Sequence, residues 1–314
     1  MKSASMKFKG YLFAALAAGA YGTNPAFAVP LYGEGMNALS VLLFRYLMGL
    51  PILAAMIAWR GRSFRLPPEQ RWPVAILGVL MAASSLALFE AYNYMNSGVA
   101  STLLFVYPVM VAVLMTFFFH ERFKTTTGLC LIVMGLGLGL LMHKNDGESV
   151  SAMGFVLVMA SSLTYAIYLV MINVSKQIRK IPTLTLLFYT LLSGSALFGI
   201  MLLPGGLTMP PTAGSWINLV ALALIPTVIS LLLTTRAIQL IGSTPTAIFG
   251  ALEPVTAVVL SIVILNQDIT ANEIYGGVLI IVATTLVVVS DPVETVLLRM
   301  RKMFPSVRRK KGSK

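Results

Sequence analysis

Long runs of apolar residues follow one another along the chain and are separated by short polar segments. A helix needs roughly 20 apolar residues to cross about 30 Å of hydrocarbon, and a window of that length finds ten runs. Several connections are only two or three residues long, so neighbouring spans are predicted to be antiparallel. The pattern predicts an all-α integral membrane protein whose ten transmembrane helices cover residues 10–30, 37–58, 72–95, 98–119, 127–142, 152–174, 183–203, 215–235, 244–265 and 273–290.

The sequence also matches itself, first at an offset of 144 residues and then at offsets of 146 and 148. The matched pairs are Gly10 with Gly154, Tyr21 with Tyr165, 42–44 with 186–188, Trp72 with Trp216, Ala91 with Ala237, Ser97 with Ser243, Pro108 with Pro254 and Gly128 with Gly276. The chain therefore divides into a first five-helix repeat (10–142), a second (152–290) and a basic tail (291–314). Because five is odd, the second repeat enters the bilayer inverted, an arrangement typical of transporters.

Composition and charge fit this interpretation and orient the chain. Hydrophobic residues make up 57% of the 314 residues and charged residues 11%, against about 25% charged in soluble domains. Of the 23 Lys and Arg residues, 21 fall on one side of the predicted bundle, Lys144 alone lies on the other, and Arg45 lies inside a span. Short basic loops stay in the cytoplasm, so both termini are predicted to be cytoplasmic in a multi-pass protein of the inner (cytoplasmic) membrane.

The N-terminus has a second interpretation. Lys2, Lys7 and Lys9, the apolar stretch after them and Ala26-Phe27-Ala28 resemble a cleavable signal peptide. We favour a retained first span, because this segment has a repeat partner later in the chain. The basic residues are scattered through loops and the tail without a nucleic-acid motif, so no nucleic-acid partner is predicted.

Two motifs stand at equivalent places in the repeats. In the fourth span, residues 98–101 lead to Tyr107-Pro108 and end at His120-Glu121; in the ninth, residues 243–245 lead to Leu252-Glu253-Pro254. With these motifs, the chain resembles the drug/metabolite transporter superfamily, in its ten-helix branch with two EamA domains. That resemblance implies secondary transport of small metabolites, often amino acid export. Such proteins usually end the ninth span in an acidic residue, whereas this chain has Asn266-Gln267.

Three charged residues lie clearly within predicted spans: Arg45, Glu90 and Glu253. A charge inside the bilayer is costly, about 2.5 to 3.5 kcal/mol for a central Arg, so each should face the bundle interior with a partner. Arg45 and Glu90 lie at similar depths and can pair. That pair would be either a structural salt bridge or a gate or recognition pair for a zwitterionic solute.

Glu253 lies about 15 Å into the ninth span, near the midplane, and its repeat partner is Tyr107. Equivalent residues near a midplane twofold axis approach each other, so Tyr107-Pro108 and Glu253-Pro254 are predicted to flank a central cavity. Each proline also frees a carbonyl one turn earlier, at Leu104 and Gly250. Glu253 is the candidate for proton coupling, or alternatively caps backbone groups at the kink.

Other polar residues on cavity-lining spans suit an amphipathic metabolite, although tyrosines in membrane helices are also interface anchors or packing residues. These candidates are Asn24, Tyr92, Asn93, Tyr165, Tyr168 and Tyr189. Arg236, the repeat partner of Glu90, either reaches the cytoplasmic interface or guards the inner vestibule. Residues 135–139, with three glycines, permit close helix contact within a monomer or at the seam of a weak homodimer.

The favoured function is secondary active transport of a small metabolite, with amino acid export first among the candidates and the lipid bilayer and protons as partners. A lipid scramblase, a facilitator or a membrane scaffold could use the same helices. An enzyme is not predicted, because His120 and His143 lie at helix ends on opposite sides and no catalytic set converges. With a single cysteine, Cys130, and no phosphate-binding motif, neither a metal nor a cofactor is expected.

Overall fold

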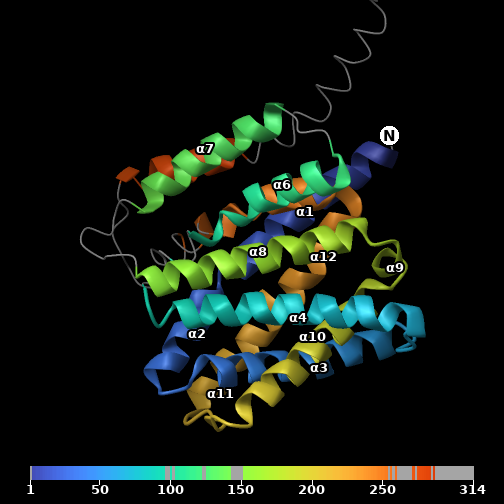
Figure 1. The fold of residues 1–314 in the computed structure, drawn as a ribbon, viewed down its shortest axis with the longest axis vertical. Coiled ribbons are helices and arrows are strands. Elements are labelled where there is room, and N and C mark those ends of the chain that lie inside the picture. Colours follow the sequence, from blue (N-terminus) through green and yellow to red (C-terminus); the bar gives the residue numbers. More distant parts are fainter. Residues whose placement is uncertain are drawn as a thin grey trace, which may run out of the picture.

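The structure is a computed structural model that describes residues 2–95, 100, 103–121, 125–142, 151–253, 255–256, 259, 271–272, 274–283 and 286. All regular structure in these residues is helical (Figure 1). The elements are α1 (Lys2–Tyr21), α2 (Asn24–Gly33), α3 (Ala38–Trp59), α4 (Pro68–Ala91), α6 (Tyr107–Phe119), α7 (Thr125–Met142), α8 (Ala152–Val174), α9 (Lys176–Arg179), α10 (Thr183–Leu202), α11 (Ala213–Leu222), the π-helix η1 (Ala223–Ile229), α12 (Ser230–Ile241) and α13 (Ser243–Phe249). A further described helical stretch covers residues 274–283.

Within these ranges, six helical segments are long and apolar enough to cross a membrane. They are Ser5–Gly33, Ala38–Trp59, Pro68–Ala91, Ala152–Val174, Thr183–Leu202 and Ala213–Ile241, and shorter apolar helices cover Tyr107–Phe119, Thr125–Gly137 and Ile274–Ala283. The all-helical fold is thereby confirmed for the described residues, and six of its segments have the length and composition of membrane spans. The total of ten spans stays a prediction.

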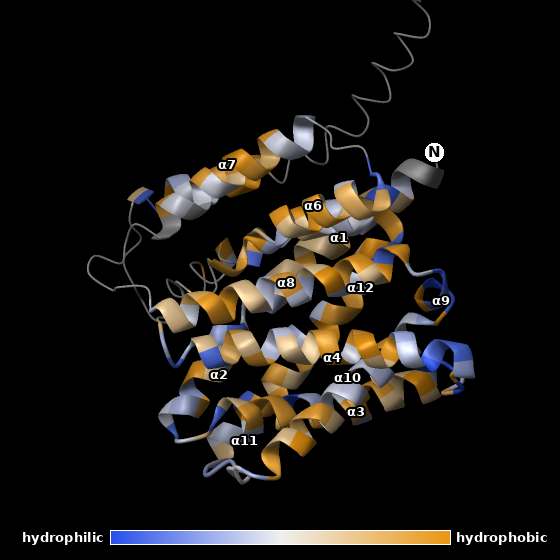
Figure 2. Ribbon diagram, viewed as in Figure 1, coloured by the Kyte–Doolittle hydropathy of each residue, from blue (hydrophilic) through white to orange (hydrophobic). Residues whose placement is uncertain are grey.

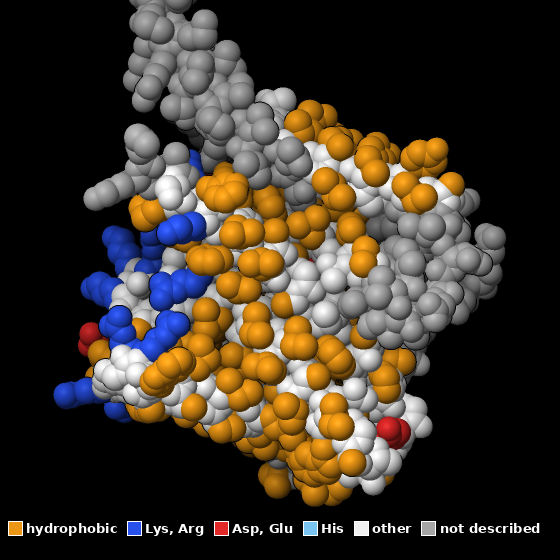
Figure 3. Space-filling model, turned by 180° about the vertical axis from the view of Figure 1, so that it is seen from behind, with side chains coloured by type: hydrophobic (Ala, Val, Ile, Leu, Met, Phe, Trp, Pro, Cys, Tyr) orange, Lys and Arg blue, Asp and Glu red, His pale blue; other side chains and the backbone are white. Residues whose placement is uncertain are grey.

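The outer surface of the helices is largely apolar, as contact with lipid requires. The long helices consist mainly of hydrophobic residues along their length, and hydrophilic residues gather near the helix ends (Figure 2). Lys and Arg side chains collect along one side of the molecule, at the left in Figure 3. Large apolar side chains such as Trp72, Phe117 and Ile217 are more than two-thirds exposed, which is stable only in contact with lipid or another apolar surface.

Two predicted spans are broken in ways that the apolar pattern did not reveal. The first bends at Gly22-Thr23, between α1 and α2, and the eighth passes through the π-helix η1 between α11 and α12. The short α9 was also not predicted. By contrast, the sixth span, predicted at 152–174, matches α8 at both ends.

Equivalent residues of the two repeats make equivalent contacts across the molecule. A Cβ added to Gly10 would lie 2.6 Å from Ile241 Cγ2, and one added to Gly154 would lie 2.5 Å from Met95 Cε. The offsets of 144 and 146 relate Gly10 to Gly154 and Met95 to Ile241. Each repeat thus begins with a glycine packed on the end of the third span of the other repeat.

The middles of the same helix pairs show the same relation. Ser84 Oγ donates a hydrogen bond to Ser161 O at 3.1 Å, joining α4 to α8, and Ser230 Oγ donates to Ala17 O at 3.0 Å, joining α12 to α1. Ser84 and Ser230 are related by 146 residues, and Ala17 and Ser161 by 144. The crossing of α4 with α8 therefore repeats as the crossing of α12 with α1, as a twofold relation between the halves requires.

The glycine-rich seventh helix packs within the chain. A Cβ at Gly137 of α7 would lie 2.8 Å from the carbonyl oxygen of Gly276, so these two helices approach closely. This confirms the helix contact that the glycines predicted. A methyl group added at Gly135 or Gly139 would meet no atom within 4 Å, so these two glycines lie on open faces of α7.

Candidate functional site

The fourth and ninth spans both interrupt their regular hydrogen bonding, at places that differ by one residue in the repeat alignment. Ahead of α6, the Val106 N–H donates to Leu103 O at 3.2 Å, and after α13 the Glu253 N–H donates to Gly250 O at 2.8 Å. Both are bonds between residues three apart, where a regular α-helix bonds residues four apart. Discontinuous helices related by a repeat axis form binding sites in many transporters.

Pro108 has the effect on the backbone that its position predicts. It stands at the second position of α6, so the Leu104 carbonyl receives no hydrogen bond from an amide at 108. Ser162 Oγ, from α8, lies 3.1 Å from this oxygen and donates a hydrogen bond to it. The freed carbonyl at Leu104 is thereby satisfied across the repeat interface. Pro254, the other predicted helix break, lies outside the described residues.

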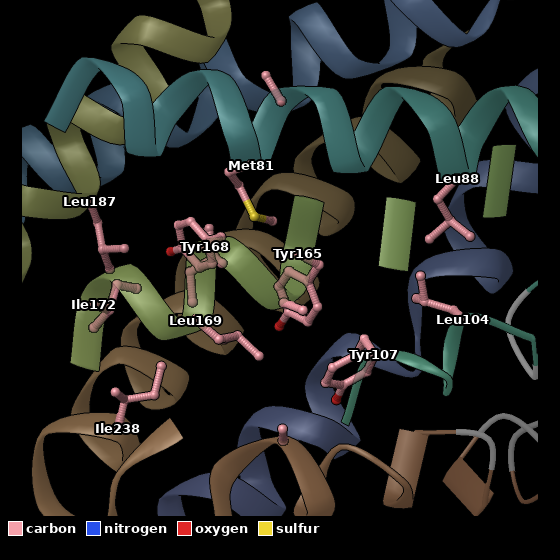
Figure 4. Close-up of a cluster of buried hydrophobic side chains, with 14 of the residues drawn as sticks. Met81, Leu88, Leu104, Tyr107, Tyr165, Tyr168, Leu169, Ile172, Leu187 and Ile238 are labelled. Atoms are coloured by element: carbon pink, nitrogen blue, oxygen red, sulfur yellow. The ribbon is translucent and has the colours of Figure 1, made fainter. Parts of the chain in front are cut away.

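A column of tyrosines lies beside these breaks. Tyr165 stacks on Tyr21 (centroids 6.2 Å apart, planes at 13°) and on Tyr168 (6.0 Å and 10°). Tyr107 meets the Tyr165 ring edge-on at 5.0 Å. Figure 4 shows Tyr165 between Tyr168 and Tyr107 in the interior. Tyr21 and Tyr165 are repeat partners, so the two halves meet through equivalent rings at the centre of the protein.

Glu253 joins this tyrosine cluster. Its side chain is 8% exposed, and it lies within Coulombic reach of Tyr21, Tyr107 and Tyr165. A Cβ placed on Gly250 would lie 1.5 Å from the Tyr107 hydroxyl oxygen. The Tyr107 ring, which α6 carries, therefore fits against the break that follows α13 only because residue 250 has no side chain. The structure therefore brings together Tyr107 and the turn that carries Glu253, which the repeat predicted to be neighbours.

The bend in the first span packs against the same turn. Thr23 Oγ1 donates a hydrogen bond to Ala20 O at 2.7 Å just after α1 ends at Tyr21. A Cβ at Gly22 would lie 2.5 Å from the Glu253 carbonyl oxygen, closer than real Cβ atoms approach. A glycine is therefore needed where the backbone of the bend meets the backbone of the ninth span.

Arg45, on α3, is fully buried close to this centre. Its Nε donates a 2.5 Å hydrogen bond to Thr227 Oγ1, and its Cζ lies 5.4 Å from the centroid of the Phe89 ring. Nη1 and Nη2 are buried and have no hydrogen-bonding partner. Among the charged side chains that the structure describes, only Arg45 and Glu253 are buried.

Glu90 does not pair with Arg45. Glu90 is partly exposed near the end of α4, and its Oε2 accepts a 3.1 Å hydrogen bond from Asn93 Nδ2, whose side chain is exposed. The Tyr32 hydroxyl lies within Coulombic reach of both charges and donates to Phe89 O at 3.3 Å. Glu90 bonds Asn93, and Nη1 and Nη2 of Arg45 have no partner, so the predicted ion pair is not formed.

The acceptor for Arg45 comes from the π-helix. Pro226 lies within η1 and has no N–H, and the wider turn lets the next residue's hydroxyl, Thr227 Oγ1, donate to Leu222 O at 2.7 Å while accepting from Arg45. The residue equivalent to Pro226 in the first repeat is Leu80, inside the continuous α4. Sequence reasoning missed Thr227, and the proline within an apolar span was the available signal.

The remaining candidates fall in three environments. Asn24 is buried, and neither its Oδ1 nor its Nδ2 has a partner; the buried Tyr168 hydroxyl lies near that of Thr235. Tyr92 lies beside Phe89, with ring centroids 5.6 Å apart. Tyr189 is only partly buried, and its hydroxyl donates to Phe64 O at 2.8 Å in the α3–α4 loop, away from the tyrosine column. The exposed Arg236 donates to Gln239 Oε1 at 3.3 Å.

Comparison with known proteins adds family information. Residues 8–143 and 152–289 each match the model of the EamA-like transporter family. An uncharacterized transporter from Synechocystis is 26% identical over 259 residues, covering 78% of this chain and 77% of the relative. The uncharacterized transporter YdfC of Bacillus subtilis is 24% identical over 78% of this chain and 80% of its own. An uncharacterized transporter from Archaeoglobus fulgidus is 27% identical over 79% and 85%.

A solved crystal structure has the same fold. It aligns with a TM-score of 0.73 over 90% of this chain and 98% of its own, at 16% identity. At that identity the likeness concerns the arrangement of the helices alone. Among the residues described here, no three His, Cys, Asp or Glu side chains gather where they could hold a metal ion.

Proposed function

We propose, from the premise that this chain belongs to the EamA-like transporter family, that it is a secondary active transporter that moves a small metabolite across the cytoplasmic membrane by alternating access. Amino acids and related small polar or amphipathic solutes leaving the cell are the favoured cargo. The observation that carries the proposal is the set of buried polar groups without partners, on Asn24 just after the bend of the first span and on Arg45 beside the π-helix of the eighth span.

Unsatisfied polar groups are costly in a protein interior, about 1 to 3 kcal/mol for a neutral group and more for a charged one. A structural core would pair them or replace them with apolar residues. A transport site needs the opposite, because its polar groups must be available to a solute that arrives and leaves. The aromatic rings around them can cover the apolar part of such a solute.

Alternating access is supported by the repeated contacts. Gly10 with Ile241 and Gly154 with Met95 are the same contact made once by each repeat. Two copies of one fold can hold slightly different conformations and exchange them, which opens a central site to one side and then to the other. The stacked Tyr21 and Tyr165 would then lie close to the axis of this exchange.

The function is tested by flux into proteoliposomes. Purified full-length protein is reconstituted, and the entry of radiolabelled amino acids, nucleobases and organic acids is measured with and without an imposed pH gradient. We expect saturable flux of at least one solute class that protein-free liposomes lack. Flux of fluorescent lipid with no flux of any solute would favour a scramblase, and absence of both would favour a scaffold and overturn the proposal.

Orientation gives a separate prediction. In a Cys130→Ala background without other cysteines, single cysteines are introduced at the exposed positions Arg62, Arg179 and Gly205. Because Lys and Arg mark the cytoplasmic side, we expect a membrane-impermeant maleimide to label Gly205→Cys in intact cells and the two arginine positions only after permeabilisation. Labelling of position 205 and position 179 from the same side would contradict the predicted topology.

A further inference from the structure

We propose that the Nη1–Nη2 edge of Arg45 binds the carboxylate group of the transported solute. The site lies between α3, η1 and the bend that joins α1 to α2. This inference rests on the proposed transport function and names the chemical class of its substrate: small organic molecules that carry a carboxylate.

The charge of Arg45 is not neutralised by the protein. Its side chain is fully buried, and no hydrogen bond or ion pair reaches Nη1 or Nη2, from Glu90, Glu253 or any other described residue. Removing one partner from a buried ion pair is strongly destabilising because a bare charge is left behind. The described side chains leave Arg45 in that condition, so a matching anion would bind with a large gain.

The guanidinium is also held in place for such an anion. Thr227 Oγ1 fixes the Nε edge, and the Phe89 ring covers one face at 5.4 Å. These two contacts leave Nη1 and Nη2, which are both buried, without a hydrogen-bond partner. Two parallel N–H groups match the two oxygens of a carboxylate, and a pre-oriented fork loses little entropy when it binds.

The neighbours of Arg45 suit the rest of a small solute. The hydroxyls of Tyr21, Tyr32 and Tyr46 lie within Coulombic reach of it, and none of these groups is an anion at neutral pH. Tyr21 also lies within reach of Glu253. Tyr21 is thus within electrostatic range of both charges, so the amino group of a solute held at Arg45 could interact with the Glu253 carboxyl.

The site exists in one repeat alone, which argues against a purely structural role. The repeat partner of Arg45 is Tyr189, which bonds a loop carbonyl, and the partner of Thr227 is Met81 in regular α-helix. The shared contacts that hold the halves together thus do not include Arg45. A residue that only maintained the common fold would be expected at both places.

The test compares carboxylates with isosteric neutral molecules. Binding of amino acids, their carboxamides, the corresponding amines without a carboxyl group, and hydroxy acids is measured by calorimetry and thermal shift on the purified full-length protein. Charge-assisted hydrogen bonds discriminate by about tenfold to a hundredfold, so we expect at least a tenfold preference for the carboxylate over the carboxamide. Arg45→Gln should reduce this preference to less than twofold, and Arg45→Lys should retain part of it.

Arg236→Gln is the matched control, because it removes the same charge from an exposed position, and it should keep the wild-type preference. Arg45→Met separates the two possible roles of the charge. If Arg45 is held for a solute, an apolar side chain of similar length should leave the melting temperature of the ligand-free protein equal or higher. Thr227→Val, which leaves the charge in place, should weaken carboxylate binding several-fold.

An unchanged carboxylate preference in Arg45→Gln would overturn the inference, and so would a strong loss of ligand-free stability in Arg45→Met. Flux measurements keep this failure separate from failure of the transport proposal. If neutral solutes are carried at rates that no Arg45 variant changes, the protein is a transporter and the carboxylate site is wrong. If carboxylates bind through Arg45 but no solute crosses, the site stands and the transport function is wrong.

Discussion

Replacing Glu253 with Gln is expected to abolish the acceleration of solute flux by a pH gradient. A coupled carrier must contain a group that takes up and releases a proton, and buried carboxyls are the usual carriers of that proton in membrane transporters. Glu253 is the buried carboxyl of the described residues, and it lies at the break of the ninth span. A gradient of one pH unit can drive about tenfold accumulation of a solute coupled to one proton, since about 1.4 kcal/mol corresponds to a factor of ten. That accumulation should be lost in the Gln variant.

Equilibrium exchange distinguishes coupling from general damage. With the same solute and the same pH on both sides, exchange requires no net proton movement, so Glu253→Gln should still exchange labelled for unlabelled solute. Glu90→Gln is the matched control, because Glu90 is partly exposed and bonds Asn93. It should keep the pH response. A Glu253→Gln protein that still responds to the gradient would show that coupling lies elsewhere or that transport is passive.

Most of the described helices followed from the apolar pattern alone. The prediction at 152–174 matched α8, and Ala38–Trp59 began and ended one residue from the predicted 37–58. The breaks at Gly22 and Pro226 were missed, because an apolar window measures length and hydrophobicity. Neither property records which amide bonds which carbonyl. Pro226 in the eighth span was the visible sign of irregular hydrogen bonding.

The two site predictions had different outcomes for a geometric reason. Tyr107 and the turn of Glu253 were expected to meet because the repeat relates them, and symmetry fixes both depth and direction. Arg45 and Glu90 were paired on depth alone. Rise along a helix gives depth, but the rotation of about 100° per residue decides which neighbour a side chain faces. Arg45 bonds Thr227 in the π-helix, whereas Glu90 bonds Asn93 just after its own helix.

The structure thus combines contacts that both repeats make with two buried charges, each of which occurs in only one repeat: Arg45 in the first and Glu253 in the second. The serine and glycine contacts recur in both repeats, whereas Arg45 is matched by Tyr189 and Glu253 by Tyr107. A symmetric framework allows two conformations of similar free energy, because exchanging the conformations of the two repeats nearly converts one into the other. A charge that occurs in only one residue of a repeat pair makes the free energies of the two conformations unequal. A bound solute or proton could shift the balance between them.

Gly250→Ala is expected to lower thermal stability strongly and to stop transport. Gly250 has φ −54° and ψ −26°, which alanine can adopt, so the cost of the substitution comes from the atoms that the added methyl meets: the Tyr107 ring and, at 2.9 Å, the Ala247 carbonyl oxygen. The added methyl would occupy the place of the Tyr107 hydroxyl and lie 2.8 Å from Tyr107 Cζ. The ring cannot easily move, because it is 2% exposed and packs against Tyr165 at 5.0 Å and Phe105 at 5.7 Å. Overpacking of this kind costs about 1 to 3 kcal/mol.

Two further variants test whether the clash with Tyr107 causes the loss of stability. Gly199→Ala makes the same substitution within α10, where no atom lies within 4 Å of the added methyl, and it should leave the melting temperature unchanged or raise it slightly. Tyr107→Phe removes the hydroxyl that the methyl would meet, so Gly250→Ala should cost less in the Tyr107→Phe background than in the wild type. Melting curves in detergent and exchange flux measure both effects. Equal losses in the two backgrounds would mean that the Tyr107 hydroxyl does not set the separation of the two broken spans, and that Gly250 is required there for another reason.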